Sequence, residues 1–191
     1  MLSEFPNPVC LKEFLEEKYL QYNSPRFIES DPISIPHLFS KKEDIEISAF
    51  LSATIAWGQR PTIIRNAQKL MSMMDDNPYD FIMNCSNREL NSFNSFVHRT
   101  FNGEDCLYFI RALREIYHQK GGMEVIFTDG FQQDKTIKTA ISHFRKVFLS
   151  FTPPARSIKH VANPESGSSA KRINMLMGVI KVGNGHILGL L

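Results

Sequence analysis

Cysteine is scarce in this chain of 191 residues, and its three copies (Cys10, Cys85 and Cys106) stand far apart with no C-x-x-C pair. A scattered, odd number of cysteines excludes a disulfide framework and a cysteine-based zinc cluster, and it is typical of a reducing compartment. Long apolar runs are absent too, since no stretch reaches the roughly 18 residues of a membrane-spanning helix and the first residues lack the pattern of a signal peptide. These absences predict a soluble, cytoplasmic protein with no membrane partner.

The recurrent signatures of enzyme sites are also missing. The six histidines show no H-E-x-x-H or similar spacing for a metal, and the chain holds neither a G-x-S-x-G turn nor a Walker loop. No two carboxylates stand out as an acid–base pair. The residues alone therefore predict no metal site, no cofactor and no catalytic residue.

Helical periodicity dominates what is present. Hydrophobic residues make up 42% of the chain and include fifteen phenylalanines, enough for a sizeable core. Apolar residues recur at helical spacing through most segments, and no segment shows the sustained alternation of a strand. The prediction is an all-α, orthogonal multi-helical fold of about eight helices, with residues 1–175 as a single helical domain and residues 176–191 as an atypical C-terminal tail.

Local signals give the expected boundaries of some helices. The strings Ser40-Lys-Lys-Glu43 and Ser86-Asn-Arg-Glu89 match the capping box, in which a hydroxyl and a carboxylate satisfy the first free amides of a helix. Residues 23–40 hold three prolines and are expected to form an irregular connector.

An elbow between two helical runs stands out in residues 47–66, ISAFLSATIAWGQRPTIIRN. A glycine is suited to end the first helix and a proline to start the second. The corner carries the chain's only tryptophan, Trp57, followed by Gln59 and Arg60. One interpretation is a ligand-facing corner, where Trp57 stacks on a base, Gln59 hydrogen-bonds it and Arg60 holds a phosphate. The other is structural: Trp57 packs in the core, Gln59 holds the turn and Arg60 pairs with an acid.

Charge divides the chain unevenly. Residues 1–134 carry thirteen lysines and arginines against nineteen acids, a net charge of −6. Residues 135–172 carry eight against one acid, a net charge of +7. Such asymmetry indicates either a polyanionic partner or two halves that attract each other across the fold.

The basic half contains a long irregular loop over residues 152–170, rich in proline and serine. Loops of this length inside a domain are usually functional or disordered. The loop and the helix expected after it carry seven candidate anion ligands: Arg156, Lys159, His160, Ser168, Ser169, Lys171 and Arg172. The serines are placed to cap that last helix, whose amides would favour a phosphate among the basic side chains. The alternative is a solvated basic loop that meets the acidic N-terminal half.

Two stretches resemble an uncharacterised bacterial family known only as a domain of unknown function: residues 31–82, which begin DPISIPHLFSKKEDIEIS, and residues 158–175, IKHVANPESGSSAKRINM. The resemblance covers residues 5 to about 175, and that family is in turn similar to the helix-hairpin-helix DNA glycosylases of base-excision repair. It implies a helix-hairpin-helix DNA-glycosylase-like fold with a groove between two helical lobes. It also implies a DNA partner, with RNA as the alternative nucleic acid.

The catalytic machinery of such glycosylases does not match this chain. They use a helical hairpin with an L-P-G-x-G-type turn, usually a nearby lysine nucleophile, and an aspartate further along. The nearest string, Val182-Gly183-Asn184-Gly185, is followed by only six residues. After Met175 the chain reads LMGVIKVGNGHILGLL, which departs from the family pattern. We therefore expect a truncated or frameshifted end and no catalysis by this chain.

The resulting prediction is a nucleic-acid-binding helical domain of glycosylase-like ancestry. Its predicted contact residues are Trp57, Gln59, Arg60, Arg156, Lys159, His160, Ser168, Ser169, Lys171 and Arg172. The competing prediction is a helical protein-interaction or regulatory module with no nucleic-acid role, whose basic half faces an acidic protein partner.

Overall fold

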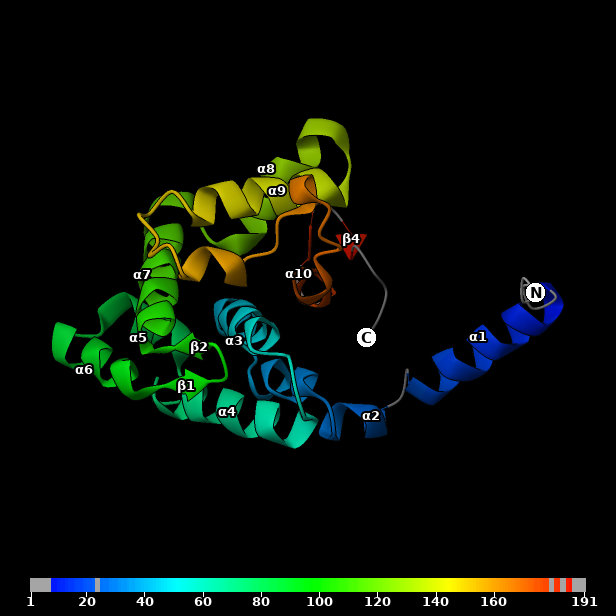
Figure 1. Cartoon of the computed structure of the whole chain (residues 1–191), viewed down its shortest axis with the longest axis horizontal. Helices are drawn as coiled ribbons and strands as arrows, with labels where there is room; N and C mark the ends of the chain where they lie inside the picture. The colour runs from blue at the N-terminus through cyan, green and yellow to red at the C-terminus, as the bar shows by residue number, and fades with distance from the viewer. Residues whose placement is uncertain (1–7, 23–24, 179–180, 183–184, 187–191) are drawn as a thin grey trace.

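The computed structural model describes residues 8–22, 25–178, 181–182 and 185–186, which are mostly helical (Figure 1). The α-helices are α1 (Pro8–Tyr22), α2 (Pro25–Glu29), α3 (Lys42–Thr54), α4 (Arg60–Ser72), α5 (Pro78–Asn84), α6 (Asn87–Asn91), α7 (Gly103–Lys120), α8 (Met123–Asp134), α9 (Ile137–Phe148) and α10 (Lys171–Met177). The 3-10 helices are η1 (Pro32–Ser34), η2 (Pro36–Leu38), η3 (Ser92–Ser95), η4 (Ser157–His160) and η5 (Pro164–Ser166). Two antiparallel hairpins pair β1 (Val97–His98) with β2 (Phe101–Asn102) and β3 (Lys181–Val182) with β4 (Gly185–His186). The all-α prediction is confirmed.

The described residues hold ten α-helices rather than about eight. One addition is α2, a helix of five residues inside the proline-rich connector, where so short an element leaves no periodic signal. The other is α8, whose interior carries Gly130, a residue that disfavours helix. Its missing side chain allows α9 to approach closely, because a Cβ on Gly130 would lie 2.7 Å from the Cβ of His143.

The two capping-box predictions have different outcomes. At the start of α6, Ser86 Oγ accepts the amide of Glu89, and the Glu89 carboxylate accepts the amide of Ser86, so this box is confirmed. The box at Ser40 is wrong. α3 starts one residue later, with Lys41 as its N-cap and no side-chain cap bond. Glu43 is then the second helical residue, one position short of where a capping box needs it.

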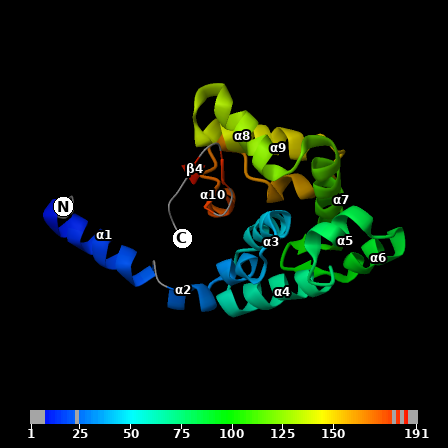
Figure 2. The same ribbon diagram turned by 180° about the vertical axis from the view of Figure 1, so that it is seen from behind.

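α3 is the central helix, as its apolar sequence on most sides predicts. Ile47, Phe50 and Leu51 are at most 1% exposed. The ring of Phe50 lies 5.3–5.6 Å, between centroids, from the rings of Phe109, Phe144 and Phe148. Figures 1 and 2 show α3 within the body of the molecule, with α4 on one side and the α8–α9 pair on the other. One core therefore joins the acidic N-terminal helices to the basic C-terminal ones.

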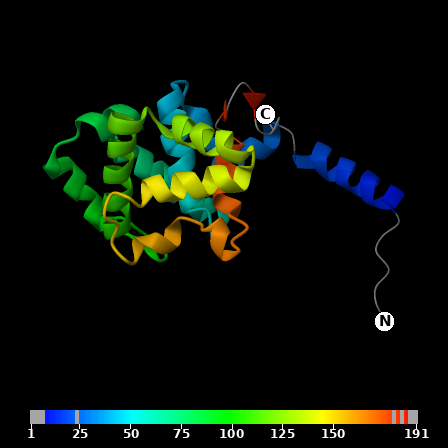
Figure 3. The same cartoon turned by 90° about the horizontal axis from the view of Figure 1, so that it is seen from above.

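α1 stands apart from this body. Views from the front, the back and above all show it extending away from the other helices (Figures 1, 2 and 3). Among the described helices, none combines the length and the apolar character that crossing a bilayer requires. The cytoplasmic location and the domain limit at residue 175 stay predictions. Much of the expected tail, including residues 183–184 of the V-G-N-G string, lies outside the described residues.

Candidate functional site

The elbow and the basic loop, which are far apart in the sequence, meet at one place. The ring of Trp57 stacks on the imidazole of His160 with a centroid distance of 5.9 Å and an interplanar angle of 17°. The guanidinium carbon of Arg172 lies 4.9 Å from the Trp57 ring centroid, a cation–π contact. His98 meets the Trp57 ring edge-on, with 5.3 Å between centroids. We call these four residues the Trp57 cluster.

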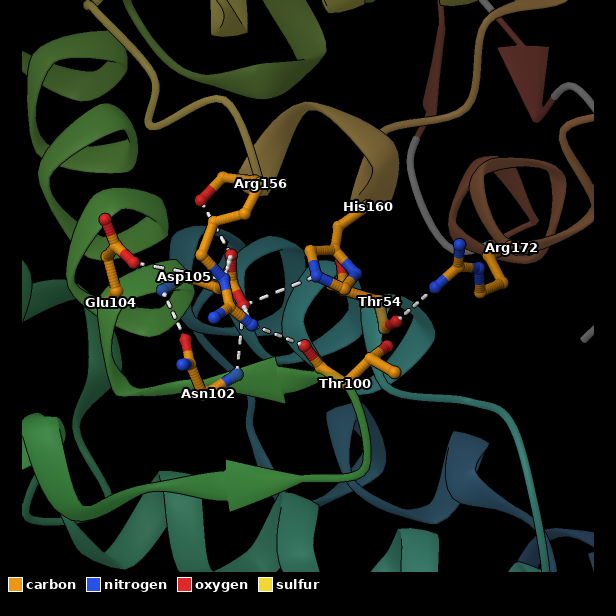
Figure 4. A network of polar contacts seen from close by, with 9 residues as sticks. Thr54, Thr100, Asn102, Glu104, Asp105, Arg156, His160 and Arg172 are labelled. Atoms are coloured by element: carbon orange, nitrogen blue, oxygen red, sulfur yellow. Dashed lines mark hydrogen bonds and ion pairs between the residues drawn. The ribbon is translucent and has the colours of Figure 1, made fainter.

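The end of α3 fixes the position of Trp57. Nη1 of Arg172 donates to the carbonyl of Thr54 at 2.6 Å, so a cation caps the C-terminus of this helix, where free carbonyls gather (Figure 4). On the other side, His98 Nε2–H donates to the carbonyl of Trp57 at 3.2 Å. Nδ1 of His98 must then accept, and it takes the side-chain amide of Asn66 at 2.7 Å. The elbow is thus held from both sides by hydrogen bonds.

Asp105 is the hub of the polar network beside this cluster (Figure 4). It lies in the first turn of α7, where it forms a capping box with Asn102, and it is fully buried. The carboxylate accepts from the amide of Asn102 at 3.0 Å and from Ser157 Oγ at 2.7 Å. Arg156 Nε lies 3.2 Å from Oδ1 of Asp105, and Arg156 Nη2 lies 3.1 Å from Oδ2. His160 Nε2 lies 3.4 Å from the same Oδ2. One buried carboxylate thereby fastens η4, and with it the middle of the basic loop, to α7.

Burial and charge set the protonation of these groups. Burial by itself would raise the pKa of Asp105, but the amide of Asn102 and the donors Ser157 and Arg156 hold that pKa below its usual range. The pKa of His160 is lowered by burial first and further by Lys159 and Arg172, against the opposing effect of Asp105. The pKa of His98 is also lowered, chiefly by burial. At neutral pH the positive charge of this region therefore resides on its arginines and lysines.

The predicted arginines have internal partners. Arg156 also donates to the carbonyl of Thr100 at 2.9 Å and lies 3.9 Å from Glu104, so it contacts the acidic half, as one of the two interpretations of the loop expected. Arg60 lies 3.7 Å from a carboxylate oxygen of Asp31 and over the ring of Phe27, which matches the structural interpretation of the elbow. Their predicted role as nucleic-acid ligands stays a prediction.

The other predicted side chains differ in their surroundings. Lys159, Lys171 and Gln59 are exposed. The two lysines form no ion pair or hydrogen bond within the described ranges. Gln59 is the N-cap of α4 but makes no side-chain cap bond. These side chains lie free at the surface.

The predicted serine caps of the last helix are wrong. The N-cap of α10 is Ala170, in the left-handed conformation (φ 49°), with no side-chain cap bond. Ser168 Oγ accepts the amide of Ala170 at 3.2 Å, ahead of the helix, while Ser169 uses its carbonyl to accept from Asn174 Nδ2 at 2.9 Å. The helix is only seven residues long, and the phosphate site expected at its start stays a prediction.

Sequence reasoning missed three members of the site: His98, Arg99 and Asp105. Arg99 is exposed and covers the elbow, since a Cβ on Gly58 would lie 2.9 Å from its Nε. Asn102 and Asp105 have the spacing of a capping box, which was the one available signal for the hub. No group of three or more histidine, cysteine or acidic side chains within the described part of the chain is arranged to hold a metal ion.

The comparison with protein families gives one result that spans the site. Residues 31–178 match the model of a family described as "Protein of unknown function (DUF2400)". The chain belongs to this family. The matched region contains the elbow, the Asp105 hub and the basic loop. No curated protein and no solved structure matches the chain.

Proposed function

We propose that this protein binds a nucleic acid through the cations around the Trp57 cluster. The observation that supports this most is the meeting of elbow and basic loop, where Trp57 contacts both His160 and Arg172. The elbow carries the aromatic ring, and the basic loop with α10 carries most of the cations. Together they gather an aromatic ring and several positive side chains on one surface, a combination suited to a polyanion with bases.

Four cations belong to this surface: Arg99, Lys159, Lys171 and Arg172. Lys159 and Arg172 are close enough to lower the pKa of His160, and Arg99 lowers that of His98. Lys171 is exposed and precedes Arg172 in α10. Phosphate contacts by such side chains supply most of the sequence-independent affinity of nucleic-acid-binding proteins. The two lysines are the main phosphate ligands in this proposal, because the guanidinium of Arg172 already binds the Thr54 carbonyl and the Trp57 ring.

The proposal includes the kinship with helix-hairpin-helix DNA glycosylases that the sequence resemblance implies. The family region of residues 31–178 contains every side chain of the proposed surface. DNA is therefore the first ligand to test, with RNA as the second. Base excision by this chain is not proposed, because the sequence shows no hairpin followed by the expected lysine and aspartate.

The test is fluorescence anisotropy with labelled undamaged and abasic duplexes across a salt series. We expect saturable binding with a log–log salt slope of about −2 to −5, as a few phosphate contacts give. The double variant Lys159→Glu/Lys171→Glu should weaken binding on every sequence and reduce the size of that slope by about two. Tighter binding to the abasic duplex than to the undamaged one would indicate that the protein shares a ligand preference with the glycosylases, in addition to the proposed ancestry.

The matched control is Arg88→Glu/Lys120→Glu, which makes the same change in net charge elsewhere. Arg88 is exposed on α6, and Lys120 ends α7 about 22 Å along the helix axis from Asp105. This variant should bind almost as the wild type does. Equal weakening by both variants would mean that net charge alone acts, and a folded protein that shows no saturable binding at low salt would overturn the proposal.

A protein-interaction role is the second candidate, and α1 is the observation that favours it. Leu11, Phe14, Leu15, Tyr19 and Leu20 of this helix are 43–72% exposed. Contiguous exposed apolar side chains mark surfaces that meet another molecule. Such an association would survive high salt and depend on α1 rather than on the lysines, so the salt series separates the two candidates.

A further inference from the structure

An apolar pocket of about 190 Å³ lies between α3, α10 and the connector helices η1 and η2. The small side chains of Ala49, Ser52 and Ala53 on α3 line it, and Met175 and Leu176 of α10 line it as well. A cavity of about 150 Å³ is enough for benzene, so this pocket has room for a phenylalanine or leucine side chain.

The lining of the pocket contains a buried hydroxyl group, that of Ser52, without a hydrogen-bond partner among the described residues. Ser52 is 2% exposed. Buried hydroxyl groups are normally paired, because leaving one unpaired costs free energy. Both the apolar volume and this hydroxyl therefore indicate an occupant that brings an apolar side chain and a hydrogen-bonding group.

Helix α1 of the same chain presents a row of large, exposed apolar side chains. Leu11, Phe14, Leu15 and Tyr19 are 43–56% exposed and follow the i, i+3, i+4, i+8 spacing that places them on one face of α1. α1 makes no extensive contact with any other described element. We call these four residues the α1 stripe. It carries large apolar side chains where the pocket has small ones, and Tyr19 adds a hydroxyl.

We infer that the α1 stripe of a second copy of this chain docks in the α3–α10 pocket, and that the exchange is reciprocal. Phe14 or Leu15 fills the pocket, and the hydroxyl of Tyr19 is available to Ser52 Oγ. The contact is a helix laid in an apolar groove, a common mode of recognition.

The course of the chain favours a second copy over the chain's own pocket. Only residues 23–24 separate α1 from α2, and the connector goes directly from α2 to η1 at the pocket. From there α1 leads away from its own body in all three views (Figures 1, 2 and 3). A two-fold exchange keeps this course and closes the assembly. Each copy then contributes one helix and one pocket, so the two-fold exchange makes the same contact twice.

The test is the mass of the full chain in solution, by light scattering after size exclusion and by sedimentation over a range of concentrations. We expect a dimer. Phe14→Asp/Leu15→Asp should raise the dimer dissociation constant by about 100-fold or more, because it places charges on the two central anchors. The body should remain folded, since α1 makes no extensive contact with the other described elements. Leu20→Asp is the matched control: Leu20 is 72% exposed, lies off the stripe, and should leave the dimer intact.

A pocket variant completes the test. Met175 lines the pocket and is 47% exposed, so Met175→Glu should leave the fold intact and weaken the dimer. A wild-type protein that is monomeric at all concentrations would overturn the inference. So would a dimer that resists Met175→Glu while Phe14→Asp/Leu15→Asp abolishes it, because α1 would then pair with another α1. Loss of the dimer with Leu20→Asp as well would indicate nonspecific apolar association, which also contradicts it.

Discussion

The arginines and the lysines of the basic loop and α10 differ in where they lie, although they contribute equally to the net charge. Arg156 is turned onto Asp105, and Arg172 onto Thr54 and Trp57. Lys159 and Lys171 point outward with no ion pair among the described residues. A planar guanidinium suits carbonyls, carboxylates and aromatic faces, whereas an ammonium group is strongly hydrated. The comparison shows that one basic segment serves two purposes: the arginines build the surface, and the lysines are free to meet a partner.

Removing the buried carboxylate that binds Arg156 should have the largest effect. Asp105→Ala leaves the amide of Asn102, the hydroxyl of Ser157 and the guanidinium of Arg156 without their shared acceptor. We expect the free energy of unfolding to fall by about 2–4 kcal/mol, because each buried donor that loses its acceptor costs about 1–3 kcal/mol. Urea unfolding followed by circular dichroism measures it. Asp129→Ala, at an exposed site on α8, should change stability by less than about 0.5 kcal/mol, and an equally mild effect at Asp105 would contradict the role of the hub.

Arg172→Lys keeps the charge and removes the guanidinium. Lysine cannot both reach the Thr54 carbonyl with the same geometry and cover the Trp57 ring, so we expect a loss of about 1–2 kcal/mol. The control is Arg65→Lys, at an exposed position on α4, which should be neutral. Equal changes in the free energy of unfolding for the two substitutions, measured by urea unfolding, would contradict the structural role of the Arg172 guanidinium.

The lowered pKa of His160 predicts that the stability of the fold depends on pH. Because burial, Lys159 and Arg172 lower its pKa, the folded protein takes up this proton at a lower pH than the unfolded chain, in which histidine titrates near pH 6.5. The stability that neutral His160 provides is present above about pH 6.5 and is lost as the pH falls through the folded pKa. We expect the free energy of unfolding to decrease below pH 6.5, by at most about 1.4 kcal/mol per pH unit from this residue. Stability curves from pH 7.5 to 5 should be flatter for His160→Gln, and an unchanged slope would refute the assignment.

The smallest effect on stability is expected at the lysines. Lys159→Ala and Lys171→Ala remove exposed side chains that have no partner among the described residues, so each should change the free energy of unfolding by less than about 0.5 kcal/mol. The same variants should still weaken nucleic-acid binding. A substantial loss of stability in either variant would show that the lysines, like the arginines, are structural.

Much of the fold was predictable because it follows from local pattern. The buried character of α3 and the capping box at Ser86 are properties of neighbouring residues, and both predictions are confirmed. The box at Ser40 failed because a shift of one residue in the start of α3 moves Glu43 out of register. Helix α8 was not predicted because its interior holds Gly130, which disfavours helix. The reason for this glycine is the close approach of α9, and a local sequence pattern does not reveal such a contact.

The site was predictable only in part. Its two segments stood out by composition, Trp57 at the elbow and the cations of the loop, but nothing in their spacing indicated that they meet. The partners of Arg156 and Arg172 lie 51 and 118 residues away in the chain, at Asp105 and Thr54. Pairings at such separation depend on how helices pack, so single-sequence reasoning identified the cations without telling the inward ones from the outward ones.

The position of Trp57 has a practical consequence. It is the only tryptophan in the chain, and its indole contacts the imidazole of His160 and the guanidinium of Arg172. Its intrinsic emission therefore comes from one known place, the surface where the elbow and the basic loop meet. The unlabelled wild-type protein already carries a reporter there, and an occupant of that surface, or a loosening of it, would be recorded by a single residue.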